Sequence, residues 1–377
     1  MSHINLLIKP ASGNCNMRCK YCFYHDVIDN RETKTYGMMS LETLEITIKN
    51  VLSLPITDCT IAFQGGEPTL RGLDFYRHLI EYVKKYNKNN IRVHYALQTN
   101  GYIIDNEWAE FFAVNNFLIG LSMDGIKDTN DLHRIDALGV GTYKKVMHTI
   151  QLFKNHKVEF NILTVVTAQV AKNIGKIYGF YKRNGLSFQQ YIPCIDPFGE
   201  ERGKYEHSLT PELYAYFLKT LFNLWYHDIK RGEFSYNRYF ENLVGMILGL
   251  RPESCGMAGV CTRQYVLEAD GSVYPCDFYV LDKLKIGNFT TDSIETLEKN
   301  RKELGFIEQS MQVNEKCKKC KWFSLCRGGC RRDRESGEND ELTLNYYCSA
   351  YEEFFEYAFE KLCEIARMVR NNEIGRK

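Results

Sequence analysis

Residues 15–22 read CNMRCKYC, which places Cys15, Cys19 and Cys22 at the spacing C-x3-C-x2-C just after the first predicted strand. Three thiolates this close in sequence can fold around one compact metal centre. A cubane iron–sulfur cluster normally takes four thiolates, so three leave one iron with an open coordination position, as reactive metal sites have. The alternative is a zinc site in which His25 supplies the fourth ligand.

Strand-like and helix-like patterns alternate on both sides of this loop. The predicted strands are 5–9, 60–64, 92–99, 117–123, 159–166 and 188–193, and the predicted helices are 40–52, 73–86, 106–113, 143–154 and 171–183. Six alternations favour an α/β fold with a parallel sheet and covering helices, which could close partly into a barrel. In such folds ligands bind at the carboxyl ends of the strands, where the motifs of this half of the chain fall.

Composition limits the class and compartment of the protein. The chain has 377 residues, of which 44% are hydrophobic and 25% charged, as in a globular protein of about two domains. Its 48 basic and 47 acidic residues give a net charge of +1, which gives no support for a nucleic-acid partner. Residues 1–10 lack a secretory signal, and no apolar run is long enough to span a membrane. We therefore expect a cytoplasmic protein whose 14 cysteines serve metal or redox chemistry rather than disulfides.

Eight further cysteines lie in a region, 255–348, that is rich in Gly and Lys/Arg and has little periodicity. They are Cys255, Cys261, Cys276, Cys317, Cys320, Cys326, Cys330 and Cys348. Eight thiolates make two complete four-ligand sites, which can pass electrons or hold the fold but have no open metal position. Spacing alone would pair Cys330 with Cys317, and two zinc sites are the alternative. Because this region cannot build a large apolar core, bound metal would have to stabilise it.

These patterns predict four parts of the chain: a barrel over 1–235, a helical bridge over 236–254, a cysteine-rich domain over 255–348 and a helix packed on the body over 349–377. Thr210 and Pro211 start a helix that continues to about residue 225. In the last helix, an apolar stripe is expected in the core; it consists of Phe355, Ala358, Phe359 and Leu362. The charged run 331–334 is expected to be a solvated face.

Polar and glycine residues follow several of the predicted strands. Residues 64–68 read QGGEP, and two adjacent glycines allow positive φ and close approach of the backbone to a ligand. Residues 122–125 read SMDG at the end of the fourth strand, and Arg134 a little downstream suits a carboxylate ligand. Asp277 follows Cys276 directly, so a metal-bound Cys276 would hold this acid close to the metal, where it could act as a general base.

The cysteine loop, with its aromatic residue before the third cysteine, resembles the radical S-adenosylmethionine (radical SAM) superfamily, and the glycine motif resembles that superfamily's GGE motif. The resemblance implies a partial (β/α)6 barrel in which the open iron binds the amino and carboxylate groups of S-adenosylmethionine. Its cleavage yields a 5′-deoxyadenosyl radical that removes a hydrogen atom from the substrate. The residues implied to contact the cofactor are Tyr21, Gly65, Gly66, Glu67, Ser122, Asp124, Arg134 and Ile195.

The cysteine-rich region resembles the SPASM domain, which carries two auxiliary clusters in radical SAM enzymes that act on peptides and proteins. The resemblance implies a nearer cluster held by Cys255, Cys261, Cys276 and Cys330. It implies a farther cluster held by Cys317, Cys320, Cys326 and Cys348. With the first loop, the chain would then hold three [4Fe–4S] clusters. The crossing of Cys330 and Cys348 between the two sites comes from this resemblance and not from spacing.

Four segments, KYCFYH (20–25), QGGEPT (64–69), GSVYPCDFY (271–279) and NYYC (345–348), resemble the anaerobic sulfatase-maturating enzymes, and the likeness extends from residue 7 to about 359. It implies oxidation of a Cys or Ser, in an unfolded Cys/Ser-x-Pro-x-Arg segment of a sulfatase, to Cα-formylglycine. Asp277 would be the proton acceptor, and a flavodoxin or ferredoxin a suitable low-potential electron donor. The alternatives are a SPASM enzyme that forms thioether or carbon–carbon crosslinks in a ribosomal peptide and, more remotely, a zinc-binding scaffold protein.

Overall fold

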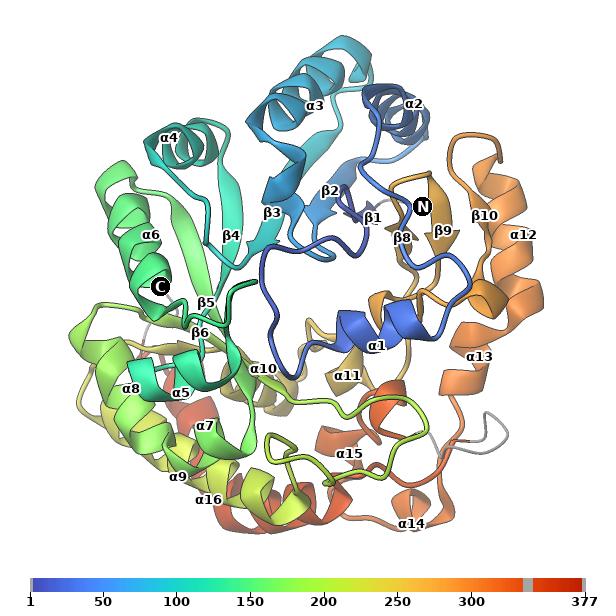
Figure 1. Ribbon diagram of the computed structural model, residues 1–377. Helices are drawn as coiled ribbons and strands as arrows, with labels where there is room; N and C mark the ends of the chain where they lie inside the picture. The colour runs from blue at the N-terminus through green and yellow to red at the C-terminus, as the bar shows by residue number, and fades with distance from the viewer. Residues whose placement is uncertain (1–2, 335–341, 375–377) are drawn as a thin grey trace. The chain divides into compact units, whose positions relative to one another are not determined.

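The computed structural model describes residues 3–334 and 342–374 (Figure 1). It divides into two compact units. The first unit comprises Met1–Ser122, Asp131–Phe160 and Arg263–Phe306. The second unit comprises Met123–Asn130, Asn161–Thr262 and Ile307–Lys377. Each unit therefore needs segments that are far apart in the sequence. No helix in the described ranges combines the length and the apolar character needed to cross a membrane.

The first unit contains a sheet with the strand order β10-β9-β8-β1-β2-β3-β4. These strands span His3–Ile8 (β1), Asp58–Phe63 (β2), Arg92–Thr99 (β3), Phe117–Ser122 (β4), Tyr265–Leu267 (β8), Ser272–Tyr274 (β9) and Gly287–Asn288 (β10). β1 pairs in parallel with both β2 and β8, so that Leu6 lies opposite Ile61 on one side and Tyr265 on the other. β3 and β4 continue the parallel order, whereas β9 and β10 run antiparallel to their neighbours.

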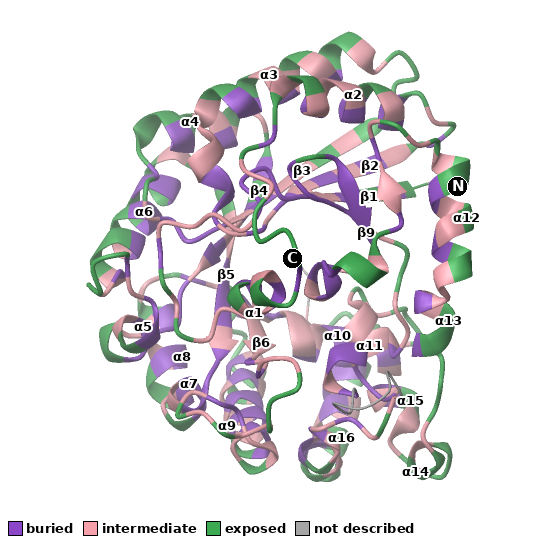
Figure 2. Cartoon of the chain, turned by 45° about the vertical axis from the view of Figure 1, so that its right-hand side comes forward, coloured by how far each residue is buried: buried purple, intermediate pink, exposed green. Residues whose placement is uncertain are grey.

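In the first unit, the helices bury part of their surface, and α2, α4 and α12 begin at residues whose side chains cap them. They are α1 (Phe23–Asp29), α2 (Leu41–Leu52), α3 (Leu73–Tyr86), α4 (Asn106–Val114), α6 (Tyr143–His156) and α12 (Ile294–Leu304), while α5 (Lys127–His133) and α13 (Phe306–Ser310) contain residues of both units. The Ser40 hydroxyl accepts a hydrogen bond from the Thr43 N–H and starts α2. α3 buries Phe75, Tyr76 and Leu79, which share a face. Figure 2 shows exposed residues along the outward sides of α2 and α3 and buried residues on the strands below them.

The second unit contains the parallel strands β5 (Glu159–Val166), β6 (Phe188–Pro193) and β7 (Tyr236–Asn237). Its helices are α7 (Ala168–Lys172), α8 (Ile174–Arg183), α9 (Pro211–Lys230), α10 (Arg238–Ile247), α11 (Cys255–Ala258), α14 (Glu315–Lys318), α15 (Phe323–Cys326) and α16 (Cys348–Arg370). Thr210 caps α9 by accepting a hydrogen bond from the Leu213 N–H. α9 and α16 pack together, and the rings of Phe222 and Phe354 meet edge to face with centroids 5.7 Å apart.

The six predicted strands are confirmed within two residues at each end. The helix predicted over 171–183 is wrong in its bounds, because α7 starts earlier and Asn173 separates it from α8. The region 255–348 holds more regular structure than expected, namely β8, β9, β10 and α12. In α16, Phe355, Ala358 and Leu362 are buried as expected, but Phe359 is 37% exposed and meets the Trp322 ring at 5.2 Å.

The three arginines of the charged run 331–334 are buried, so its expected role as a solvated face is wrong. The three arginines in it are at most 6% exposed. Arg332 lies over the ring of Phe198 at 3.8 Å and donates a hydrogen bond to the backbone oxygen of Asp196. Arg202 pairs with Asp333 at 3.3 Å. These contacts fasten the segment after β6 to the segment after Cys330, within the second unit.

Candidate active site

The cysteine loop leaves β1 and runs antiparallel to a short segment of the same unit. The Arg18 N–H donates to the Ile135 oxygen at 2.7 Å, and the Lys20 N–H donates to the His133 oxygen at 3.1 Å. Met17 forms an antiparallel bridge with Asp136 next to the first of these bonds. Backbone pairing with residues 133–136 therefore holds the loop before α1 begins after Cys22.

All three thiols of the loop are half-buried, and Cys15 lies near enough to Cys19 and Cys22 for their charges to act on one another. The Met17 N–H donates to Cys15 Sγ at 3.4 Å, and the Asn100 side-chain amide donates to the same sulfur at 3.8 Å. Burial raises the pKa of Cys15 to about 11, and the neighbouring charges of Glu67 and Cys19 act in the same direction. A metal bound here would offset this penalty, because it would hold the sulfur as thiolate. A three-sulfur set with N–H donors directed at sulfur fits an iron–sulfur cluster.

The glycine pair holds the end of β2 against this loop. Gly65 has φ +116°, and a Cβ on Gly66 would lie 2.1 Å from the backbone oxygen of Asn14. The Gly66 N–H donates to the Ser12 oxygen, and the Glu67 N–H donates to the Asn14 oxygen at 2.8 Å. Only residues without a side chain permit this close approach of two backbones.

Glu67 is buried, and its carboxylate is occupied by protein donors. Oε1 accepts hydrogen bonds from the N–H and hydroxyl of Thr69 and from the Thr99 hydroxyl. Oε2 accepts one from the Asn100 N–H at 2.7 Å. Burial raises the pKa of this carboxyl, and these four donors act against that rise. Glu67 thus joins the segments that follow β2 and β3.

The other residues expected at the cofactor fall in different units. Tyr21 and Arg134 belong to the first unit, where the buried guanidinium lies 5.6 Å from the centre of the Tyr21 ring. Ser122 ends β4 in the first unit and is half-buried. Asp124 and Ile195 belong to the second unit; the Asp124 carboxylate is buried and accepts a hydrogen bond from the Val165 N–H at 3.0 Å, and Ile195 is half-buried just after β6.

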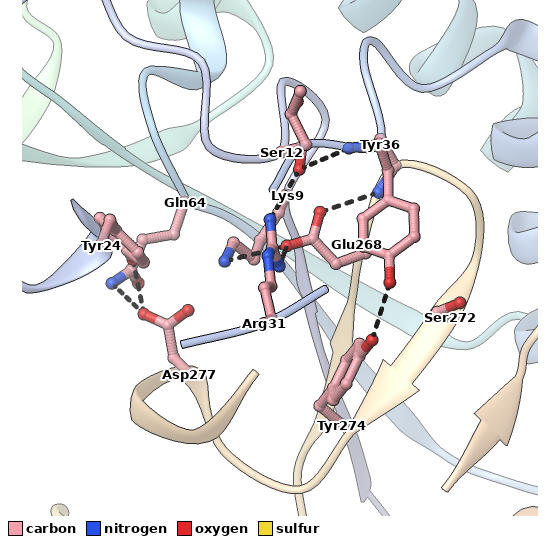
Figure 3. Close-up of polar contacts among 12 residues, drawn as sticks. Lys9, Ser12, Tyr24, Arg31, Tyr36, Gln64, Glu268, Ser272, Tyr274 and Asp277 are labelled. Carbon is pink, nitrogen blue, oxygen red and sulfur yellow. Dashed lines mark hydrogen bonds and ion pairs between the residues drawn. The ribbon is translucent and has the colours of Figure 1, made fainter. Parts of the chain in front are cut away.

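Asp277 is buried and has one occupied and one free oxygen. The Tyr24 hydroxyl donates to Oδ2 at 2.5 Å, and the Gln64 amide donates to the same atom at 2.9 Å (Figure 3). Oδ1 is buried too and has no hydrogen-bond partner in the described chain. Burial raises the pKa of this carboxyl, while Lys9 and Tyr24 act to lower it. A buried oxygen without a donor is suited to accept a proton from a bound substrate.

A buried ionic group lies beside Asp277 (Figure 3). Glu268 Oε1 contacts Lys9 Nζ at 3.2 Å and Arg31 Nη1 at 2.7 Å, and all three side chains are at most 1% exposed. Lys9 Nζ also lies 4.8 Å from the centre of the Tyr24 ring. Two cations share one carboxylate here, and an ionised Asp277 brings the charge of the group to zero.

The auxiliary cysteines gather in the second unit, apart from Cys276. A small cavity is lined by all four of the cysteines Cys317, Cys320, Cys326 and Cys348, together with apolar walls from Trp322, Phe323 and Phe355. Cys330 has Cys255 and Cys261 among the charges that act on its thiol. Thiol donors within apolar walls suit iron–sulfur clusters. Among residues 3–334 and 342–374, no three Cys, His, Asp or Glu side chains are grouped tightly enough to hold a single metal ion.

Sequence reasoning missed the surroundings of Asp277. Tyr24 and Gln64 lie in the motifs 20–25 and 64–69, which imply no role for them, and Lys9, Arg31 and Glu268 lie outside every motif. The sequence gives two signals of this group: Lys9 directly follows an apolar strand, and Glu268 lies within the apolar run that contains β8. A further candidate, Asn16, has a buried amide nitrogen without a hydrogen-bond partner in the described chain, as expected beside a polar cofactor.

One larger cavity lies away from all predicted residues. It has a volume of about 520 Å³ in the second unit and is lined in part by Phe234, Tyr236, Leu250 and Val369. It contains none of the expected cysteines or cofactor residues. The cysteine sets and Asp277 therefore define the candidate site, and the larger of these two cavities does not.

Comparison with known proteins agrees with this reading. Residues 10–179 match the family model of the radical SAM superfamily, and residues 255–321 match that of the SPASM iron–sulfur cluster-binding domain. A cysteine-type anaerobic sulfatase-maturating enzyme of Clostridium perfringens is 51% identical over 98% of this chain and 100% of its own length. The Clostridium novyi enzyme of the same type is 47% identical over 97% and 98%. A serine-type enzyme of Bacteroides thetaiotaomicron is 30% identical over 93% and 88%.

Solved structures give the same result. Native anSMEcpe with bound AdoMet superposes with a TM-score of 0.94 at 50% identity, covering 97% of this chain and 100% of that chain. Streptococcus suis SuiB, at 18% identity and a TM-score of 0.63, covers 92% of this chain and 77% of its own, and shares the fold alone. The expected α/β fold class, a radical SAM partial barrel core with a C-terminal SPASM domain, is confirmed. The chain belongs to the anaerobic sulfatase-maturating enzymes of the radical SAM superfamily.

Proposed function

We propose that this enzyme oxidises a cysteine in a sulfatase polypeptide to Cα-formylglycine without oxygen, and that Asp277 is the proton acceptor. The relatives that are 47–51% identical are named cysteine-type enzymes, whereas those named serine-type are 26–30% identical, which favours cysteine as the target. The observation that carries the proposal is the free, buried Oδ1 of Asp277 beside an Oδ2 that already accepts two hydrogen bonds.

The proposed cofactors are S-adenosylmethionine and three [4Fe–4S] clusters. Cys15, Cys19 and Cys22 would hold the first cluster, and Tyr21 and Arg134 would contribute to the S-adenosylmethionine site. The nearer auxiliary cluster would be held by Cys255, Cys261, Cys276 and Cys330, and the farther one by Cys317, Cys320, Cys326 and Cys348. When bound, these groups supply a radical that takes one hydrogen atom from the substrate Cβ and an exit for one electron.

The protein's own side chains orient one proton-accepting oxygen and stabilise the negative charge of its carboxylate. Tyr24 and Gln64 fix the carboxylate by bonding Oδ2, so that Oδ1 of Asp277 can take the thiol proton. Loss of the Cβ hydrogen atom, the thiol proton and one electron converts the cysteine into a thioaldehyde, and water then replaces sulfur to give the aldehyde and hydrogen sulfide. The positive charge of Lys9 near Asp277 stabilises the carboxylate that must be present at the start.

The proposed partners follow from this chemistry. The substrate is an unfolded or nascent segment with the pattern Cys-x-Pro-x-Arg, and Asp277 must reach its side chain. A low-potential one-electron donor, such as a flavodoxin or ferredoxin, would reduce the first cluster. We place the reaction in the cytoplasm, where thiols stay reduced.

The test is an anaerobic turnover assay with a Cys-x-Pro-x-Arg peptide, comparing wild type with Asp277→Asn. The new amide would keep its oxygen toward Tyr24 and Gln64 and present an N–H₂ group, which cannot accept a proton, where Oδ1 was. We expect aldehyde formation to fall by about 10²–10⁴-fold, as for loss of a general base, while 5′-deoxyadenosine is still produced.

Asp282→Asn is the matched control. Asp282 lies five residues farther along, is exposed and accepts a hydrogen bond from the Glu32 N–H at 2.7 Å. This variant should form aldehyde at the wild-type rate. Full aldehyde yield from Asp277→Asn, measured by mass loss and hydrazine trapping, would rule out Asp277 as the base. A Ser-x-Pro-x-Arg peptide that turns over faster than the cysteine peptide would overturn the substrate assignment.

A further inference from the structure

A short hairpin beside the cysteine loop holds two aliphatic side chains out into solvent. Leu138 is 88% exposed and Val140 is 59% exposed, and both lie in the first unit. A single apolar side chain on a surface is common and has no particular meaning. Two of them on one turn next to a functional loop form a candidate interaction site.

Hydrogen bonds fix the turn that carries these two side chains. The Asp136 N–H donates to the Val140 oxygen at 2.9 Å. The Asp136 carboxylate accepts hydrogen bonds from the N–H groups of Leu138 and Val140, both at 2.9 Å. Its other oxygen accepts one from the Tyr102 hydroxyl at 2.9 Å. A surface that is ordered before binding loses less conformational entropy when a partner docks.

The same hairpin is joined to the cysteine loop. The Arg18 N–H donates to the Ile135 oxygen at 2.7 Å, and Arg18 Nη1 donates to the Cys15 oxygen at 2.9 Å. Arg18 and Lys20 are the two neighbours of Cys19 in the sequence, and both are exposed. A protein that docks on the hairpin would therefore also contact the loop that is proposed to hold the first cluster.

The exposed charges around the hairpin all have one sign. In the cysteine loop (15–22) and the segment 135–145, the exposed charged residues are Arg18, Lys20, Lys144 and Lys145. Lys145 Nζ lies 5.5 Å from the centre of the Tyr102 ring, whose hydroxyl binds Asp136. Asp136 is the one carboxylate in the sequence of these two segments, and it is buried with three hydrogen bonds. Within the described ranges, none of the four cations forms an ion pair.

This surface fits a partner that is apolar at the centre of its contact area and acidic around it. The pattern disfavours the substrate, because a Cys-x-Pro-x-Arg segment is itself cationic. It also disfavours a second copy of this chain docked through the same face, because like charges would then oppose one another. The proposed reaction requires one other protein partner, which reduces the first cluster. Small low-potential electron carriers such as flavodoxins and ferredoxins have acidic surfaces around their redox groups.

We propose that the hairpin face, formed by Arg18, Lys20, Leu138, Val140, Lys144 and Lys145, docks an acidic one-electron carrier that reduces the first cluster. This inference rests on the proposed function, which requires that reduction. The carrier loses one electron and the cluster gains it, and no bond forms or breaks in this step. Docking beside the cysteine loop keeps the path of the electron short, which matters because electron transfer slows steeply with distance.

The test measures 5′-deoxyadenosine formation with two reductants. One is a flavodoxin kept reduced by its NADPH-dependent reductase, and the other is sodium dithionite, which needs no docking surface. Leu138→Glu, which puts a carboxylate at the apolar centre, should raise the KM for flavodoxin about tenfold or more and leave the dithionite-driven rate at the wild-type level. Lys144→Glu/Lys145→Glu should also raise this KM and make it less dependent on ionic strength. An unchanged KM in either variant, or an equal loss of rate with both reductants, would overturn the proposal.

Val114→Glu and Lys84→Glu are the matched controls. Val114 is 72% exposed at the end of α4, and Lys84 is exposed in the last turn of α3. Both belong to the first unit but lie outside the cysteine loop and the segment 135–145. Neither control should change the KM for flavodoxin. A rise as large as that in the hairpin variants would indicate a general effect of charge and would overturn the proposal.

A binding measurement separates a failure of the docking surface from a failure of the proposed function. Oxidised flavodoxin is titrated into the full-length enzyme by calorimetry at low ionic strength, where no turnover occurs. The wild type should bind it weakly, as transient electron-transfer partners do, and Leu138→Glu about tenfold more weakly still. Equal affinities would overturn the proposal.

The dithionite assay tests the remaining possibilities. A wild type that forms no 5′-deoxyadenosine with dithionite refutes the proposed function, and the flavodoxin titration then still decides whether the hairpin face docks the carrier. A rise in the KM for the cysteine peptide in Leu138→Glu, measured with dithionite, would assign the hairpin face to the substrate and overturn the proposal.

Discussion

Replacing Glu268 by Gln should destabilise the first unit strongly. The change leaves Lys9 and Arg31 buried at 3.2 and 2.7 Å from a neutral amide instead of a carboxylate. Removing one partner of a buried ion pair typically costs about 3–5 kcal/mol, because the remaining charge stays buried without compensation. At about 2–4 °C per kcal/mol for a unit of this size, the melting temperature should fall by about 6–20 °C.

The assay is thermal unfolding followed by circular dichroism, with Glu253→Gln as the control. Glu253 pairs with Arg238 at 3.1 Å, but its side chain is 57% exposed, so the loss should stay below about 1 kcal/mol. The double variant Lys9→Met/Glu268→Gln should be more stable than Glu268→Gln alone, since it leaves one uncompensated cation instead of two. Equal melting temperatures for wild type and Glu268→Gln would refute the reasoning, as would a double variant that is less stable than the single one.

The effect also has a direction in pH. Burial alone would raise the pKa of Glu268, but Lys9 and Arg31 hold it below its usual value. The stabilisation is therefore fully present above the pKa of an unfolded Glu, about 4.3, and is lost as the pH falls through the lowered pKa of the folded state. The difference in stability between wild type and Glu268→Gln should thus shrink below about pH 4.

Two further predictions concern the site itself. Gly66→Ala would bring a methyl group to 2.1 Å from the Asn14 oxygen. This variant should lose about 1–3 kcal/mol of folding stability and hold less iron in the first cluster. Gly179→Ala in α8 is the control and should change neither property, because its nearest neighbour is the flexible Arg183 side chain at 3.2 Å. Burial raises the pKa of Asp277. This carboxylate therefore becomes protonated, and can no longer act as a base, at a higher pH than an exposed Asp, whose pKa is about 3.9. Aldehyde formation should decline on the acid side while 5′-deoxyadenosine formation does not share that decline, and an identical pH profile for both products would contradict the assignment.

Strands with a clear local sequence pattern could be predicted from the sequence. The strands β3, β5 and β6 start and end where their apolar, β-branched runs predict, because those runs fill a buried sheet. β8, β9 and β10 were missed because each is only two or three residues long, too short to show a period. Their pairing with β1 and with one another is fixed by tertiary contacts that no local pattern records.

Site residues that lie in a recognisable motif could be predicted, whereas those that reach the site through contacts distant in sequence could not. Asp277 was found through its place next to Cys276, but Tyr24 and Gln64, which bond it, are 253 and 213 positions away in the sequence. The buried arginines of 331–334 were misjudged for a related reason. A guanidinium is usually solvated, and that of Arg334 donates instead to the backbone oxygens of Gly259 and Ser310, which lie 75 and 24 positions away in the sequence.

The parallel pairing of β1 with β8 has a consequence for how the chain is made. Lys9 leaves the ribosome 259 residues before Glu268, which at 5–20 residues per second corresponds to roughly 13–52 s. During that interval one edge of β1 has no neighbour, and two cations destined for the interior have no carboxylate to meet. β1 and Lys9 therefore cannot complete their native contacts until the cysteine-rich region has been synthesised. A polypeptide released before residue 268 should be bound by chaperones or degraded by proteases.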